Sequence, residues 1–183
     1  MTIVALSGKR KSGKTEAAFE IISIGENLGL KFKKIAFADP LKDEFARAFQ
    51  IDRTLLDSTL KEEYREQLQA YGQEMRSKDS KYWIKKFFET AKHYDFVVND
   101  DTRYLNELQA MVEAKALIIR IHTDRHIRQQ RGWIEDPKID NHISEVDLDF
   151  DITTWRTLGS YIYNNKSKHD LKLELQRELK NLK

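Results

Sequence analysis

Cysteine is absent from this chain of 183 residues, so disulfides, thiolate metal sites and a cysteine nucleophile are excluded. Proline is scarce, with two residues in the whole chain, and no low-complexity linker marks a domain boundary. An excess of one charge is also missing, since 32 Lys and Arg residues face 30 Asp and Glu residues. That balance gives no argument for nucleic acid as a partner.

Long apolar runs are missing as well, because none approaches the roughly 18 residues of a membrane span. No basic-then-apolar leader segment is visible near Met1. We therefore expect one domain over 1–183, located in the cytoplasm, with no membrane or nucleic-acid partner. We expect a monomer or weak dimer that acts on a small molecule.

A glycine-rich loop stands between a strand-like run, Ile3–Leu6, and a run with helical spacing of apolar residues from Ala17 to Ile22. It matches the pattern G-x-x-x-x-G-K-[ST] at every fixed position, in the strand–loop–helix context that a phosphate-binding loop requires. Its residues, all expected to bind a nucleotide, are Gly8, Lys9, Arg10, Lys11, Ser12, Gly13, Lys14 and Thr15. A chance glycine-rich turn is the alternative, and the two correct flanks argue against it.

The chemistry of such a loop explains its residues. Glycines let backbone amides wrap a polyphosphate, and the following helix N-terminus adds partial positive charge. Lys14 is expected to reach the β- and γ-phosphates, and the Thr15 hydroxyl to bind Mg²⁺. Asn165-Lys166-Ser167 is followed by Lys168 rather than by an acid, which argues against guanine recognition. The expected nucleotide is ATP.

Strand-like and helix-like segments alternate along the chain, which predicts an α/β fold. We expect a five-stranded parallel sheet with helices on both faces. The strands are expected near 3–6, 35–38, 95–98, 116–121 and 161–163, with a final amphipathic helix capped at Ser167.

A capping box at Thr59-Leu60-Lys61-Glu62 predicts a helix that continues to about Arg76. Its apolar residues fall on one stripe, and Lys61, Arg65 and Arg76 lie along the edge of that stripe. These three are either basic residues on a solvated face or the wall of a cleft for an anionic substrate. Residues 41–93 are the expected acceptor-binding helices.

Asp101 follows the third apolar strand, at the sheet edge where α/β proteins bind ligands. Its carboxylate could bind Mg²⁺ or accept a proton from the attacking group, and Arg103 could bind a substrate phosphate. The alternative role is helix capping, which Asp100, Asp101 and Thr102 could all perform.

Arg125, Arg128 and Arg131 are spaced three residues apart in a short predicted helix that ends at Gly132. Clustered guanidinium groups without acidic partners favour an anion, and phosphoryl transfer needs such charge. The alternative is a solvated basic helix. We interpret residues 125–147 as a lid that excludes water, and Asn164 as a residue that borders the adenine.

Together these segments resemble the phosphomevalonate kinase family of animals. Ser7 to Lys14 is similar to its basic phosphate loop, and Arg128-Gln129-Gln130-Arg131-Gly132-Trp133 is similar to its lid. Shorter matches are Lys61-Glu62-x-Tyr64-Arg65, Gly72-x-Glu74-x-Arg76, Asp101-Thr102-Arg103, Asp140 and Ser144-Glu145. The resemblance extends from Ser7 to Asn164.

The resemblance implies a P-loop fold like that of nucleoside monophosphate kinases, and phosphoryl transfer from Mg-ATP to (R)-5-phosphomevalonate. By position, Lys9, Arg10, Lys11 and Lys14 would bind phosphates. Arg65, Arg76 and Arg103 would bind the acceptor, with Lys61 at the same edge. Arg128 and Arg131 would act from the lid, so that the catalytic set is Lys14, Arg10, Asp101, Arg128 and Arg131.

Two positions depart from that family. This chain has Thr15 where the family usually has an acid, and Tyr104 where it usually has a second arginine. Phe37 to Lys42, Arg103-Tyr104-x-Asn106-Glu107 and His142-x-Ser144-Glu145 resemble phage and bacterial deoxynucleoside monophosphate kinases. A nucleoside monophosphate is therefore the alternative acceptor. A nucleotide-binding switch without transfer activity is a second alternative.

Overall fold

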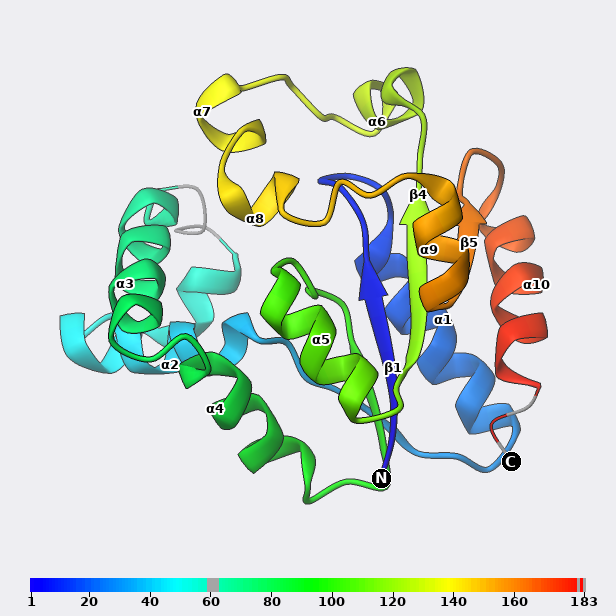
Figure 1. The fold of residues 1–183 in the computed structure, drawn as a ribbon, viewed down its shortest axis with the longest axis horizontal. Helices are drawn as coiled ribbons and strands as arrows, with labels where there is room; N and C mark the ends of the chain where they lie inside the picture. Colours follow the sequence, from blue (N-terminus) through cyan, green and yellow to red (C-terminus); the bar gives the residue numbers. More distant parts are fainter. Residues whose placement is uncertain (59–62, 181, 183) are drawn as a thin grey trace. The chain divides into compact units, whose positions relative to one another are not determined.

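The computed structural model describes residues 1–58, 63–180 and 182, and the chain forms two compact units (Figure 1). One unit comprises Met1–Lys34 together with Tyr94–Lys183, and the other comprises Ile35–His93. The first unit holds the sheet and the second is helical. Among the described residues, no helix combines the length and the apolar character that crossing a membrane requires.

All five strands of the sheet are parallel, as the alternating pattern predicts. The strands are β1 (Thr2–Ser7), β2 (Phe32–Lys34), β3 (Phe96–Asn99), β4 (Leu117–His122) and β5 (Ser160–Tyr163). Their order is β2-β3-β1-β4-β5, so β1 lies in the centre, with Val4 beside both Val98 and Leu117. The loop that follows β1 therefore begins at the carboxyl edge of the central strand, where α/β sheets bind ligands.

Helices cover both faces of this sheet. Those of the sheet unit are α1 (Lys14–Asn27), α5 (Leu105–Glu113), α6 (Arg125–Gln130), α7 (Pro137–Asp140), α8 (Ile143–Val146), α9 (Ile152–Leu158) and α10 (Lys168–Leu179). The helices α1 and α10 lie on one face, and α5 and α9 lie on the other (Figure 1). Ser167 and Asp170 form a reciprocal capping box at the start of α10, where a cap is expected.

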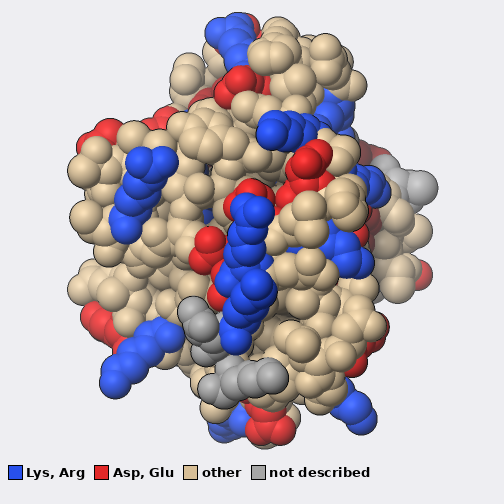
Figure 2. All heavy atoms as spheres, turned by 90° about the vertical axis from the view of Figure 1, so that its right-hand side faces the viewer, with Lys and Arg blue, Asp and Glu red and all other residues tan. Residues whose placement is uncertain are grey.

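Apolar residues of β1, β4 and β5 pack with α1 and α10 into one buried core. On the outer surface of the same two helices, Lys168 pairs with Glu16 (2.7 Å) and Lys172 pairs with Glu20 (3.4 Å). Figure 2 shows that basic and acidic side chains are interspersed on this side of the molecule. The mixed surface fits the near-neutral composition.

The second unit contains α2 (Ala38–Phe49), the 3₁₀ helix η1 (Arg53–Asp57), α3 (Arg65–Lys78) and α4 (Tyr82–Ala91). Phe45, Leu56 and Leu68 form its buried core. Trp83 donates from Nε1 to the carbonyl of Gly72 (3.1 Å), which joins α4 to α3. The capping box expected at 59–62 lies outside the described residues.

The second strand is not where the pattern predicts it. We expect it at 35–38, but β2 is Phe32–Lys34, and Ile35, Ala36 and Phe37 lead into α2 as buried residues. β2 is an edge strand, and edge strands tolerate lysines such as Lys33 that interrupt the apolar signal. The residues 35–37 are therefore apolar because they are buried, not because they pair in the sheet.

The polar segment 125–147 contains three short helices, α6 to α8, although its sequence shows little periodicity. Asp136 accepts from the backbone N–H of Lys138 (3.0 Å), and His142 accepts from that of Ser144 (3.2 Å). No helix is predicted over 152–158, yet α9 forms there with Asp151 as its cap and Trp155 buried. Capping side chains, rather than apolar periodicity, mark the starts of α7, α8 and α9.

We expect Leu175→Ala to lower the free energy of unfolding by about 2–5 kcal/mol, because it leaves a cavity beside α1. Leu175 is fully buried in the core, whereas Leu173 on the same helix is 40% exposed. Urea denaturation of both variants measures the difference. Leu173→Ala is the matched control and should stay within about 0.5 kcal/mol of the wild type. Equal losses of unfolding free energy in the two variants would show that Leu175 of α10 does not contribute to this core.

Candidate active site

The glycine-rich loop connects β1 to α1, as the sequence predicts. Gly13 has a positive φ of 94°, and a Cβ there would lie 2.3 Å from Nδ2 of Asn164. A Cβ on Gly8 would lie 2.5 Å from both the carbonyl of Ile121 and Oγ of Ser12. Any side chain at these positions would push β4 or Asn164 away from the loop, which is why glycine occurs at both.

Lys14 begins α1 and is buried beneath the loop, with 7% of its surface exposed. Its Nζ donates to the carbonyls of Gly8 (2.6 Å) and Lys9 (2.9 Å). Burial, and then the positive charge of Arg103, lower the pKa of Lys14 to about 7, although Glu145 partly opposes this. An anion placed at the loop would relieve both effects, because it would restore a favourable partner for the ammonium group.

Two further loop residues carry polar groups with distinct surroundings. The Oγ of Ser12 is buried and has no hydrogen-bond partner among the described residues. The Thr15 hydroxyl donates to Oδ2 of Asp100 (2.9 Å), and Lys34 from β2 pairs with Oδ1 of the same carboxylate (3.0 Å). Thr15 and Asp100 thus form an oxygen pair beside the first turn of α1.

Asp101 lies just after β3, and its partner is Asn99 rather than Thr15. Its Oδ1 accepts a hydrogen bond from Nδ2 of Asn99 (2.9 Å), and its backbone N–H donates to Oδ1 of Asn99 (3.2 Å). The sequence favours Asp101 as the metal-binding carboxylate, whereas the structure brings Asp100 to Thr15. Local spacing could not separate these neighbours, because the choice depends on the backbone turn that Asn99 imposes.

The predicted lid residue Arg131 and the predicted adenine residue Asn164 both contact the loop. Arg131 donates from Nη2 to the carbonyl of Asn164 (2.8 Å) and from Nη1 to that of Ser12 (3.4 Å). Nδ2 of Asn164 also donates to the Ser12 carbonyl (2.9 Å). The lid arginine therefore points toward the glycine-rich loop.

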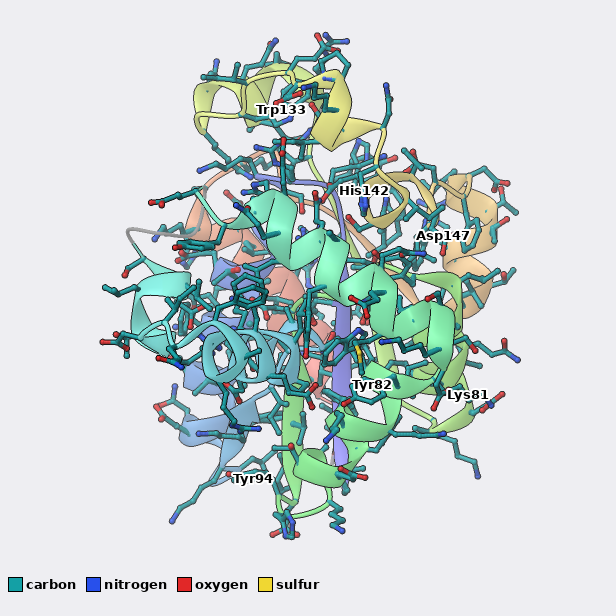
Figure 3. The ribbon with its side chains drawn as sticks, turned by 90° about the vertical axis from the view of Figure 1, so that its left-hand side faces the viewer. Lys81, Tyr82, Tyr94, Trp133, His142 and Asp147 are labelled. Carbon is teal, nitrogen blue, oxygen red and sulfur yellow. The ribbon has the colours of Figure 1, made fainter. Side chains whose placement is uncertain are left out.

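The side chains of Arg128 and Arg125, unlike that of Arg131, contact residues of the segment 125–147 itself. The guanidinium of Arg128 lies over the ring of Trp133, 4.3 Å from its centroid, and its buried Nε has no hydrogen-bond partner in the described part of the chain. Burial lowers the pKa of Arg128. Arg125 pairs with Glu135 (2.5 Å) on the surface, so the expectation that these arginines lack acidic partners is wrong for it. Figure 3 shows Trp133 and His142 within the segment 125–147.

Two basic residues at the tip of the loop pair with acids, one at the end of α7 and one after α8. Lys9 pairs with Asp149 (2.5 Å), and Arg10 pairs with Asp140 (3.5 Å). Lys11 is exposed, with a left-handed φ of 58°. Sequence reasoning found Lys9, Arg10 and Lys11 but not Asp149, because an acid in a polar segment carries no local signal.

Arg120 is a site residue that the sequence analysis missed. It lies in β4, is buried, donates from Nη1 to Oγ of Ser7 (2.8 Å), and lies 3.8 Å from Asp149. Burial lowers the pKa of Arg120. A single arginine inside the apolar run 116–121 was the signal that could have revealed it.

Glu145 is named in the sequence only as part of the family matches, and its place at the site comes from the structure. It lies in α8, and its carboxylate pairs with the guanidinium of Arg103 and accepts from the backbone N–H of Arg10 (3.3 Å). Burial alone would lower the pKa of Arg103, but Glu145 and then Asp101 raise it above its ordinary value. The structure thus joins Arg103, expected at the acceptor, to the phosphate loop.

A cavity of about 520 Å³ opens where β4, α6 and the segment after α8 meet. Its lining includes Lys9, Arg120, His122, Arg128, Asp149 and Tyr161. The size suits a small organic ligand, and the cationic lining suits an anionic one. The cavity is continuous with the basic side of the loop through Lys9.

Arg65 and Arg76 lie at the start and in the last turn of α3, within the helical unit. Lys61 lies outside the described residues. Their expected role at the acceptor, and the boundaries 41–93 for acceptor-binding helices, stay predictions.

The sheet order, the phosphate loop and the arginine-bearing segment define a P-loop kinase fold. Solved structures with this fold include a shikimate kinase from Bacteroides thetaiotaomicron, with a TM-score of 0.54, 14% identity, and coverage of 99% of this chain and 98% of that one. A shikimate kinase from Aquifex aeolicus has a TM-score of 0.50 and 11% identity, over 99% and 98% of the two chains. A dephospho-CoA kinase from Campylobacter jejuni has a TM-score of 0.50 and 15% identity, over 99% and 97%.

Sequence comparison identifies the family. The profile of the phosphomevalonate kinase family matches residues 6–116. A phosphomevalonate kinase from Drosophila melanogaster is 30% identical over 158 residues, which cover 81% of this chain and 82% of that relative. The chain belongs to the phosphomevalonate kinase family and is a phosphotransferase.

We expect Lys14→Met to stabilise the fold more at pH 6 than at pH 9. The pKa of Lys14 is about 7 when folded, against about 10.4 in an unfolded chain. Between these values the unfolded chain holds a proton that the folded chain has released, so wild-type stability rises with pH. The cost of burying the charged ammonium is complete below pH 7.

The gain from Lys14→Met should therefore be about 2–3 kcal/mol larger at pH 6 than at pH 9. Denaturant unfolding of both proteins at the two pH values measures it. A gain that does not change with pH would contradict a lowered pKa for this lysine.

Proposed function

We propose that the chain transfers the γ-phosphoryl group of ATP to (R)-5-phosphomevalonate, giving 5-diphosphomevalonate and ADP. Membership of the family supports the substrate, and the cationic cluster supports the chemistry. The observation that carries the proposal is that Arg103 lies at the phosphate loop that Lys14 ends: the Glu145 carboxylate pairs with Arg103 and accepts from the backbone N–H of Arg10. Two such cations kept together suit a reaction in which phosphates of two molecules meet.

The phosphate loop is the proposed binding site of the donor. Lys14 would leave the loop carbonyls for the β- and γ-phosphates. The loop amides and Oγ of Ser12, which has no partner among the described residues, would donate to phosphate oxygens. Arg131 would stabilise charge on the transferred group, while Asn164 would border the adenine. Arg128 would contact the nucleotide from the lid.

Arg103 is the proposed main ligand for the phosphate of the acceptor within the sheet unit. Its guanidinium can bind a phosphate bidentately, with geometry that an ammonium group lacks. Arg65, Arg76 and Lys61 are additional proposed ligands, on the grounds of family resemblance. Closure of residues 125–147 would exclude water, so that the phosphoryl group goes to the acceptor.

Thr15 and Asp100 fit the needs of Mg²⁺, since both offer oxygen donors beside the phosphate loop. Among the described residues no group of three or more His, Asp or Glu side chains could hold a metal ion. Mg²⁺ in kinases needs no such group, because substrate phosphates and water complete its shell. When bound, Mg²⁺ would neutralise phosphate charge; Asp101 remains the alternative carboxylate from the sequence.

We expect Asp100→Asn to raise the Mg²⁺ concentration for half-maximal activity by about tenfold or more, because it removes a charged oxygen ligand. Asp101→Asn is the matched variant, one residue away in the same turn. Titration of activity with Mg²⁺ at fixed ATP compares them. A larger shift for Asp101→Asn would return the metal role to Asp101.

A coupled ADP-release assay tests the acceptor. Phosphomevalonate, a panel of ribo- and deoxynucleoside monophosphates, and a sample without acceptor are compared at equal ATP. We expect rapid turnover with phosphomevalonate alone. Turnover with a nucleotide only would reassign the enzyme to nucleoside monophosphate kinases, and ATP binding without turnover of any acceptor would favour a switch.

Lys14→Ala serves as the inactive control in that assay. Removal of one group that stabilises transition-state charge lowers kcat by about a hundredfold or more. The chain is further proposed to work in the cytoplasm as a monomer or weak dimer, with 1–183 as one kinase domain and 125–147 as its lid.

A further inference from the structure

Glu145 bridges the two halves of the proposed reaction centre. Its side chain is 5% exposed, and its two carboxylate oxygens have different partners. Oε1 pairs with Nη1 of Arg103, and Oε2 accepts from the backbone N–H of Arg10 at 3.3 Å. One carboxylate therefore contacts both the donor loop and the arginine assigned to the acceptor.

The backbone of α8 has other anchors, so the Glu145 side chain is not needed to hold this helix. The carbonyl of Glu145 accepts from Nζ of Lys9 (2.6 Å), and Asp147 accepts from the backbone N–H of Leu105 (2.6 Å). Leu148, directly after them, is buried. A change from carboxylate to amide at residue 145 leaves all three anchors in place.

The electrostatics give the carboxylate a specific task. A buried carboxylate is unfavourable unless it is paired, and this one raises the pKa values of both Lys14 and Arg103. It therefore counterbalances two cations that repel each other. It pairs with Arg103 through one nitrogen, Nη1, and a phosphate could bind at the other side of that guanidinium.

We propose that Glu145 is a positioning residue for phosphoryl transfer, which orients Arg103 toward the acceptor phosphate and aligns the loop at Arg10. The inference rests on the proposed function. It explains why an acid lies among the Lys and Arg side chains that bind phosphates. The negative charge of Glu145 weakens the attraction of the site for phosphate, but it fixes the geometry of transfer. Misplacement of a reacting group by about 1 Å can lower a rate by about a hundredfold.

Glu145→Gln tests this proposal, because its effect on kcat/KM for the acceptor can be compared with its effect on the Kd for ADP. The amide keeps the shape but loses the charge, so we expect kcat/KM for the acceptor to fall by about ten- to a hundredfold. The Kd for ADP, measured by calorimetry, should stay within about twofold or become tighter, because a negative charge near Lys14 is removed. A purely structural role would instead weaken transfer and ADP binding together.

Glu135→Gln is the matched control. Glu135 is also an acid in the segment 125–147, but its pair with Arg125 is exposed, at 55% and 61% of the two side chains. We expect wild-type kcat/KM and Kd for this variant. Thermal unfolding of both variants shows whether either change has disturbed the fold.

The inference is overturned if Glu145→Gln keeps kcat/KM within twofold of the wild type, or if its transfer rate, ADP affinity and melting temperature all fall together. Failure of the proposed function looks different, because the wild type then does not phosphorylate phosphomevalonate. If the wild type phosphorylates a nucleotide instead, the same comparison with that nucleotide tests Glu145.

Discussion

The burial of several cations close together is the constraint on which the site depends. Burial lowers the pKa of Lys14 most, and the positive charges of Arg103 and Arg120 lower it further. Carboxylates lie among these cations and oppose that effect, chiefly Glu145 and Asp100, which raise the pKa of Lys14. Acids of the chain thus offset part of this positive charge, and phosphates of two substrates would take over that role when they bind.

The topology of the sheet brings these charges together. β1 lies between β3 and β4, so the ends of all three strands meet at one edge. The loop after β1 supplies Lys14, the turn after β3 supplies Asp100 and Arg103, and β4 itself supplies Arg120. The segment after β4 then returns over this edge and adds Glu145, which completes the cluster.

Motifs with fixed local geometry could be predicted. The phosphate loop and the capping box of α10 depend on neighbouring residues, and the alternation of strands and helices implies a parallel sheet. The structure has all three. The second strand was misplaced because Lys33 breaks its apolar signal at an exposed edge. Asp100 and Asp101 could not be separated, because one turn of the backbone decides which carboxylate faces Thr15.

The sequence by itself determined that a polyphosphate loop follows a strand, that basic residues accompany it, and which family the pattern resembles. Only the tertiary structure decided how the charges pair. Lys9 meets Asp149, and Arg103 meets Glu145, across 140 and 42 residues of sequence. Short-range patterns carry no information about such pairs, because strand order and the path of the chain after β4 set them.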